Sequence, residues 1–175
     1  RVDRLSLVFG YIFTIMAFIG MVYGLHVKKD GEHIAALLYV GGSIGVVFAG
    51  DFLTLFVFWE VMAFSSLFLI WLKGDKASDA AGFRYILVHI FGGVCLLGGM
   101  LLYAFQTGSA EFKAIENIGL PFYMILVGFL INAAVPPFSA WLADAYPEGT
   151  IMGSVFMCAF TTKTAVYVLI RGFAG

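Results

Sequence analysis

The chain of 175 residues is 62% hydrophobic and 12% charged, with a formal net charge of −1 and a mean hydropathy of +0.99. Soluble domains average roughly 45–50% apolar and about 25% charged residues, so this composition excludes a water-soluble fold. The sequence has no basic run and no acidic tail, so no nucleic acid partner is expected. The apolar residues form blocks of about twenty, the length that crosses a lipid bilayer.

These apolar blocks predict an all-α, polytopic membrane helix bundle of about six transmembrane helices. Polar residues 26–33 separate the first block from the second, and only Asp51 separates the second from the third. A polar connector at 73–84 precedes the fourth block, and residues 106–119 precede the fifth. The expected spans cover residues 5–25, 34–50, 52–72, 85–105, 120–146 and 149–170.

The fifth span should be discontinuous at Pro136 and Pro137. Two prolines remove two backbone donors and force the preceding residue out of the helical region. Backbone that lacks helical hydrogen bonds is tolerated at membrane depth only where protein or water satisfies it, so broken helices are typical of transport sites. A proline kink without a functional role is the alternative. We expect the interruption between Val135 and Trp141, with the freed carbonyl groups facing protein or water.

Two ionisable side chains lie deep inside expected spans. At about 1.5 Å per residue, Glu60 lies about 12 Å and Lys163 about 11 Å from the same membrane face. An ionised residue at the centre of a membrane helix costs about 2.5–3.5 kcal/mol, so such residues usually face the bundle interior and act in ion pathways. We therefore expect both side chains to point into the bundle, where a change in their pairing would release and take up protons. A purely structural ion pair is the alternative.

Two further polar residues are candidates for the same pathway. Asn132 lies beside the predicted break, where its amide can bind water or coordinate a cation. We expect it within about 15 Å of Glu60 or Lys163, in a shared hydrated pocket. His89 lies near the start of the fourth span, where it is suited to relay protons between water and the membrane midplane. Helix packing is an equally good explanation of this histidine.

No cofactor, metal or catalytic centre is expected. Cys95 and Cys158 lie inside apolar blocks without the spacing of a metal site or a disulfide, and only one histidine lies in a span, which argues against haem. The lysine and arginine distribution favours only weakly a cytoplasmic location for the loops that carry Lys28 and Lys73. Because the chain begins with Arg1 and ends directly after an apolar block, we expect residues 1–175 to be a single, partial transmembrane domain of a longer protein.

Three segments resemble the antiporter-like superfamily of ion-translocating membrane proteins. They are FVFWE, which ends at Glu60, WLADAYPE, which begins at Trp141 after the expected break, and TKTAVYVLIR, which contains Lys163. The superfamily includes proton-pumping subunits of respiratory complex I, subunits of membrane-bound hydrogenases, and large subunits, the D-type among them, of Mrp-type cation/proton antiporters. The resemblance covers residues 2–171 and implies an N-terminal-half fragment that holds a five-helix repeat plus one helix.

The resemblance implies a subunit of a multi-subunit complex that translocates H⁺ or Na⁺ in a prokaryotic cytoplasmic membrane, with other membrane subunits as partners. It implies either an Mrp-type Na⁺/H⁺ antiporter or a redox-driven translocase such as NADH:quinone oxidoreductase. Glu60 matches the family's fifth-helix glutamate, and Lys163 matches the eighth-helix lysine that passes protons onward. The sequence departs from the family where Asn132 replaces the lysine of the broken helix, and Ser139 and Ala143 replace histidine and proline. This departure favours the alternative, a structural or coupling subunit that does not pump, whereas the presence of both Glu60 and Lys163 opposes it.

Overall fold

The computed structural model describes residues 1–173, which form a helical bundle without any named strand. Within these residues, a shorter apolar helix α5 (Leu120–Asn132), a short helix α6 (Ala140–Ala145) and a 3₁₀ helix η1 (Tyr146–Glu148) follow one another. Five other helices are long and apolar enough to cross a membrane: α1 (Arg4–Gly24), α2 (Asp30–Phe48), α3 (Phe52–Trp71), α4 (Lys76–Thr107) and α7 (Ile151–Phe173). The predicted polytopic bundle with one discontinuous segment is therefore confirmed.

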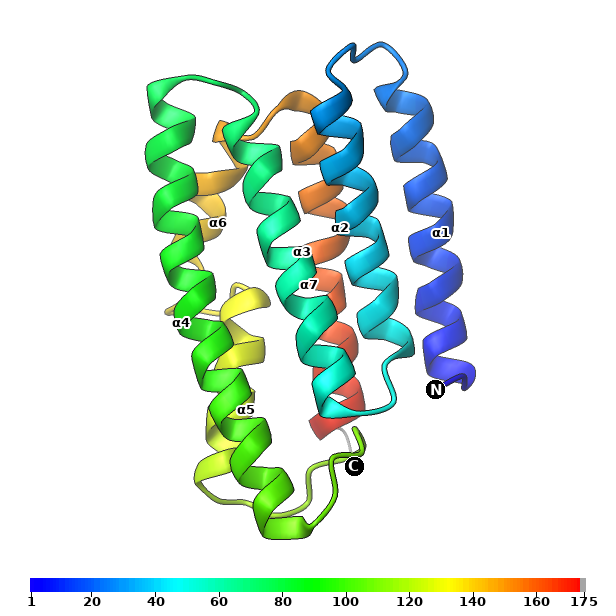
Figure 1. Ribbon diagram of the computed structural model, residues 1–175, viewed down its shortest axis with the longest axis vertical. Helices are drawn as coiled ribbons and strands as arrows, with labels where there is room; N and C mark the ends of the chain where they lie inside the picture. The colour runs from blue at the N-terminus through cyan, green and yellow to red at the C-terminus, as the bar shows by residue number, and fades with distance from the viewer. Residues whose placement is uncertain (174–175) are drawn as a thin grey trace.

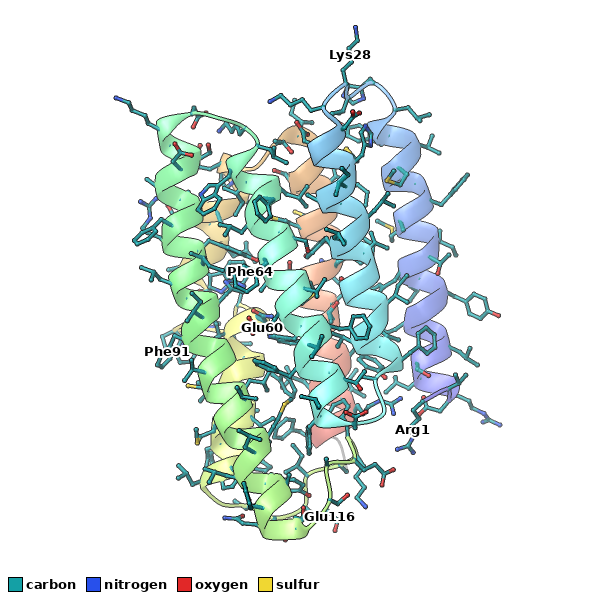
Figure 2. All side chains as sticks on the ribbon, viewed as in Figure 1. Arg1, Lys28, Glu60, Phe64, Phe91 and Glu116 are labelled. Atoms are coloured by element: carbon teal, nitrogen blue, oxygen red, sulfur yellow. The ribbon has the colours of Figure 1, made fainter. Side chains whose placement is uncertain are left out.

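The five long helices run side by side along the longest axis of the molecule (Figure 1). Helix α2 packs mainly against α3, α4 packs mainly against α5, and α7 contacts α1, α2, α3 and α5. Helices α5 and α6 follow each other along the axis beside α4, so that together they replace one continuous span (Figure 1). Lys28 marks one end of the bundle, here called the upper end, and Arg1 and Glu116 mark the lower end (Figure 2).

Side-chain caps set the first residue of several helices. The Asp3 carboxylate accepts a hydrogen bond from the backbone N–H of Ser6, and the Ser6 hydroxyl completes a capping box at the start of α1. Asp75 and Ser78 form the same box at the start of α4. Such caps satisfy backbone donors that no earlier turn can satisfy, and each stabilises its helix by about 1 kcal/mol.

The capping box explains why helix α4 begins before the expected fourth span. Hydropathy predicts a polar connector at 73–84, whereas α4 begins at Lys76 and the polar residues belong to its first turns. Helix α2 likewise begins at Asp30 rather than at residue 34, with Asp30 and Glu32 in its first turn. Acidic residues at a helix N-terminus interact favourably with the helix dipole, so polar sequence there extends the helix beyond its apolar block.

The predicted helix break begins earlier than Val135. Helix α5 ends at Asn132, and residues 133–139 form turns in which Ala134 has φ +53°. The indole N–H of Trp141 donates a 2.8 Å hydrogen bond to the carbonyl oxygen of Ile131, so protein satisfies one carbonyl freed by the break. The helix ends before Pro136 because proline disfavours helical geometry at the residue that precedes it, and Ala134 adopts the left-handed conformation.

Glycine residues allow the closest helix contacts. A Cβ atom built on Gly128 of α5 would lie 2.9 Å from the carbonyl oxygen of Gly92 in α4. A Cβ atom built on Gly42 of α2 would lie 2.9 Å from the backbone nitrogen of Met62 in α3. Small residues at such contacts let two membrane helices approach backbone to backbone. The contact at Gly128 also places the end of α5 directly against the middle of α4.

Candidate functional site

Glu60 projects from the middle of α3 toward α4 at mid-height of the bundle (Figure 2). A Cβ atom built on Gly93 of α4 would lie only 2.6 Å from Oε1 of Glu60, so the carboxylate occupies the space that this glycine leaves. The side chain is half-buried, and it also borders a groove of about 500 Å³ whose other lining residues are almost all apolar. No ion pair or hydrogen bond within residues 1–173 involves the Glu60 carboxylate.

His89 lies one helical turn before Gly93, on the same face of α4, and is 5% exposed. Its Nδ1 atom lies 2.9 Å from the carbonyl oxygen of Tyr85, and its ring stacks on the Tyr85 ring with 3.9 Å between centroids. The Trp141 ring makes a T-shaped contact with the His89 ring, with 4.7 Å between centroids. The remaining ring nitrogen, Nε2, is buried and has no hydrogen-bond partner in the described structure.

Asn132, the last residue of α5, is 2% exposed, and its Nδ2 atom is also buried without a partner among the described residues. Asn132 lies one turn after Gly128, on the helix face that contacts α4. Because Gly128 meets Gly92 and the chains of α4 and α5 run in opposite directions, the next turn of α5 lies beside the preceding turn of α4. Asn132 is therefore at the level of His89.

Lys163 occupies a different side of the molecule. The residue is exposed on α7 and borders a groove of about 610 Å³ together with Ile12 and Met16 of α1. Its ammonium group donates a hydrogen bond to the carbonyl oxygen of Cys158. The expectation that Lys163 points into the bundle is wrong for this part of the protein, and no ion pair within residues 1–173 joins it to Glu60. The reason is its position around the helix axis, which directs the side chain to α1.

Polar residues continue from His89 toward the upper end. The hydroxyl groups of Tyr85 and Ser66 are 2.7 Å apart in a buried hydrogen bond. Above them, the Arg84 guanidinium group forms two 2.7 Å hydrogen bonds with the Asp144 carboxylate. Sequence reasoning missed Tyr85 and Ser66, although the four-residue spacing of Tyr85, His89 and Gly93 places all three on one helix face.

On the lower side of Glu60 the space between the same helices is closed by apolar groups. Trp59 of α3 packs on Phe129 of α5 with 5.2 Å between ring centroids, and Leu96 of α4 is fully buried beside them. The polar residues named here therefore lie on the upper side of Glu60, and the packing on its lower side is apolar. Within residues 1–173, no group of three or more His, Cys, Asp or Glu residues is placed to hold a metal ion.

A family model described as NADH:quinone oxidoreductase/Mrp antiporter, TM, matches residues 49–174. Similar proteins include a subunit of the Na⁺/H⁺ antiporter of Alkalihalophilus pseudofirmus, which is 29% identical over 97% of the chain. The corresponding protein of Staphylococcus aureus is 28% identical over the same share. The chain spans only 23% of the length of each of these curated relatives. Both relatives are A-type subunits, where the resemblance had suggested the D-type of the same family.

Solved structures with the same fold come from three kinds of membrane complex. Respiratory complex I of Thermus thermophilus has a chain that matches 98% of this chain over 40% of its own length, with a TM-score of 0.87 and 23% identity. The Mrp complex of Dietzia sp. matches 97% of this chain over 35% of its own length, with a TM-score of 0.74 and 24% identity. An archaeal membrane-bound sulfane sulfur reductase gives a TM-score of 0.84 at 24% identity, over 91% of this chain and 36% of its own.

The chain is thus an integral, multi-pass membrane protein with one broken helix, and the family model matches more than half of its residues. It belongs to the NADH:quinone oxidoreductase/Mrp antiporter transmembrane family.

Proposed function

We propose that this chain is part of a subunit that translocates H⁺ or Na⁺ within a multi-subunit membrane complex. The observation that carries the proposal is Glu60, a carboxylate held at mid-height of the bundle against Gly93 with polar residues leading to it from one end only. An ionisable residue in a membrane interior is costly and usually marks an ion path. A path that is polar up to the midplane and closed beyond it is the arrangement expected for one half of an alternating route.

We propose gradient-driven cation/proton antiport rather than redox-driven pumping, and other membrane subunits as partners. The sequence relatives named above are Na⁺/H⁺ antiporter subunits, and they match nearly the whole chain. Both relatives are bacterial, which supports a location in the cytoplasmic membrane of a prokaryote. The polar residues around Glu60 supply proton-binding and water-binding groups but no catalytic constellation, so the chain is proposed to contribute ion conduction and no reaction of its own.

The test uses the full-length subunit within its assembled complex, in membrane vesicles with a pH-sensitive dye. Glu60→Gln keeps the size of the side chain but removes its charge and its exchangeable proton, and we expect the initial rate of proton transport to fall roughly tenfold or more. Glu116→Gln is the matched control, because Glu116 is an exposed glutamate at the lower end (Figure 2). Assembly is measured separately by native electrophoresis. An assembled Glu60→Gln complex that transports protons at the wild-type rate would rule out the proposed function.

Asn132 supports one competing function, a structural or coupling subunit that does not pump. Its amide cannot titrate, and it stands where the family resemblance implies a lysine. Under this alternative, Glu60→Gln and Lys163→Ala would both leave transport unchanged while the complex assembles. We propose instead that Lys163 serves transport through the groove that it borders with α1, so that Lys163→Ala lowers the transport rate.

A further inference from the structure

The hydrogen bond of His89 determines where this imidazole can accept a proton. A carbonyl oxygen can only accept a hydrogen bond, so the contact between Nδ1 and the Tyr85 carbonyl oxygen requires the hydrogen to be on Nδ1. In the neutral ring the other nitrogen, Nε2, then carries a lone pair. That atom is buried and has no partner within residues 1–173. His89 is thus held in the tautomer that presents a free proton acceptor to the interior.

The two unpartnered atoms of His89 and Asn132 are complementary. Nε2 of His89 is an acceptor, and Nδ2 of Asn132 is a donor, and the packing of α4 on α5 places them at one level. Buried polar groups almost always have a partner, and where protein does not supply it an ordered water does. A water molecule can donate to His89 and accept from Asn132 at the same time. A single water molecule between the two residues would satisfy both atoms.

The Glu60 carboxylate lies within reach of this water. Glu60 touches the position of Gly93, which is one turn along α4 from His89, a rise of about 6 Å. One or two bridging waters span such a distance. The contacts of Glu60 with Gly93 and of Ser66 with Tyr85 show that α3 runs alongside α4 past His89. Water can therefore connect Glu60 to His89 without a large displacement of α3 or α4.

We propose that His89 is the protonatable partner of Glu60, acting through water held by Asn132, and that the ion carried through this half of the bundle is a proton. This inference rests on the proposed function and assigns its ion. In the transfer step the O–H bond of protonated Glu60 breaks, a bridging water passes the proton on, and an N–H bond forms at Nε2 of His89. Glu60 is left as a carboxylate and His89 as an imidazolium, and loss of the Nε2 proton to water on the upper side restores the neutral ring.

The groups that surround His89 favour a proton over a sodium ion. Hard cations prefer several oxygen ligands, whereas the two unpartnered buried atoms at this level, Nε2 of His89 and Nδ2 of Asn132, are both nitrogens. The other titratable or charged groups near the ring are Tyr85 on α4, Glu60 on α3, and the Arg84–Asp144 pair and Tyr146 toward the upper end. Of these, only Glu60 offers a carboxylate that no protein cation neutralises within residues 1–173.

The test compares His89→Gln with His26→Gln in the full-length subunit within its assembled complex. Glutamine can hold the same water but cannot take up the proton, so a merely structural role of His89 would be preserved. We expect His89→Gln to lower the rate of proton transport roughly tenfold or more, and to change the pH dependence of the remaining rate. His26 is exposed in the loop after α1, and His26→Gln should stay within about twofold of the wild type.

The outcomes separate this inference from the proposed function. If Glu60→Gln abolishes transport while assembled His89→Gln keeps the wild-type rate and pH profile, the His89 inference is overturned and the proposed function stands. If both variants transport normally, both fail. A structure of the wild-type complex that resolves waters gives a check independent of any variant. An ordered water within about 3.2 Å of Nε2 of His89 supports the inference, and a dry Nε2 overturns it.

Discussion

Gly93→Ala should lower the transport rate without lowering stability, because Gly93 contacts the flexible end of the Glu60 side chain. The new Cβ atom would lie 2.6 Å from Oε1 of Glu60, whereas real contacts of this kind are rarely below 3.0–3.4 Å. The carboxylate must therefore move by roughly 0.4–0.8 Å or more, which a flexible side chain can do without moving the helix. Alanine in place of glycine in a helix interior also favours the helix by about 0.5–1 kcal/mol.

We therefore expect the assembled Gly93→Ala complex to melt at the same or a slightly higher temperature, yet to transport protons about tenfold more slowly. Misplacement of a reacting group by about 1 Å can cost two orders of magnitude in rate, so a shift of this size has a measurable effect. The matched control is Gly41→Ala in α2, because a Cβ atom there meets nothing within 4 Å. It should show the gain in helix stability without loss of transport.

The assay combines the dye-based transport rate in vesicles with the thermal unfolding midpoint of the purified complex. A wild-type transport rate in Gly93→Ala would refute the expected role of this contact, because Glu60 would then not need its place beside α4. A midpoint that falls in Gly93→Ala but not in Gly41→Ala would refute it as well, because the contact would then be a structural one.

Three further outcomes follow from the packing. Gly128→Ala places a Cβ atom 2.9 Å from a carbonyl oxygen of α4, a backbone atom that cannot rotate away. The free energy of unfolding, measured with denaturant, should therefore fall by about 1–3 kcal/mol. An unchanged free energy of unfolding would contradict the close contact. Trp141→Phe removes the 2.8 Å hydrogen bond to the last turn of α5 and should cost about 1–3 kcal/mol by leaving a buried carbonyl unpaired, to be measured in the same way. The backbone N–H of Ser6, and then Arg171, lower the pKa of Asp3 from 3.8 to about 2. The folded state thus favours the ionised form of Asp3. The ionised carboxylate stabilises the fold above about pH 4, and this stabilisation is lost as pH falls toward 2. Over this pH range, the thermal midpoint of Asp3→Asn should therefore fall less than that of the wild type.

The sequence by itself determined the class of the protein, the number of apolar blocks and the place of the helix break. These properties are local, because a span needs about twenty apolar residues and two adjacent prolines cannot continue a helix whatever surrounds them. The sequence also located Glu60 and Asn132 at depth, since depth follows from the rise per residue. The starts of α2 and α4 were missed because polar residues that cap a helix or complement its dipole look like a loop when only hydropathy is read.

Only the tertiary structure decided which of these residues meet. Glu60 and Lys163 are both far from the ends of their helices, yet helix packing turns the first toward α4 and the second toward α1. The opposed directions of α4 and α5, and their close contact at Gly128, bring His89 to the level of Asn132, although the two residues belong to different helices. Depth along a helix follows from its sequence, whereas the neighbour that a side chain faces depends on how the helices pack.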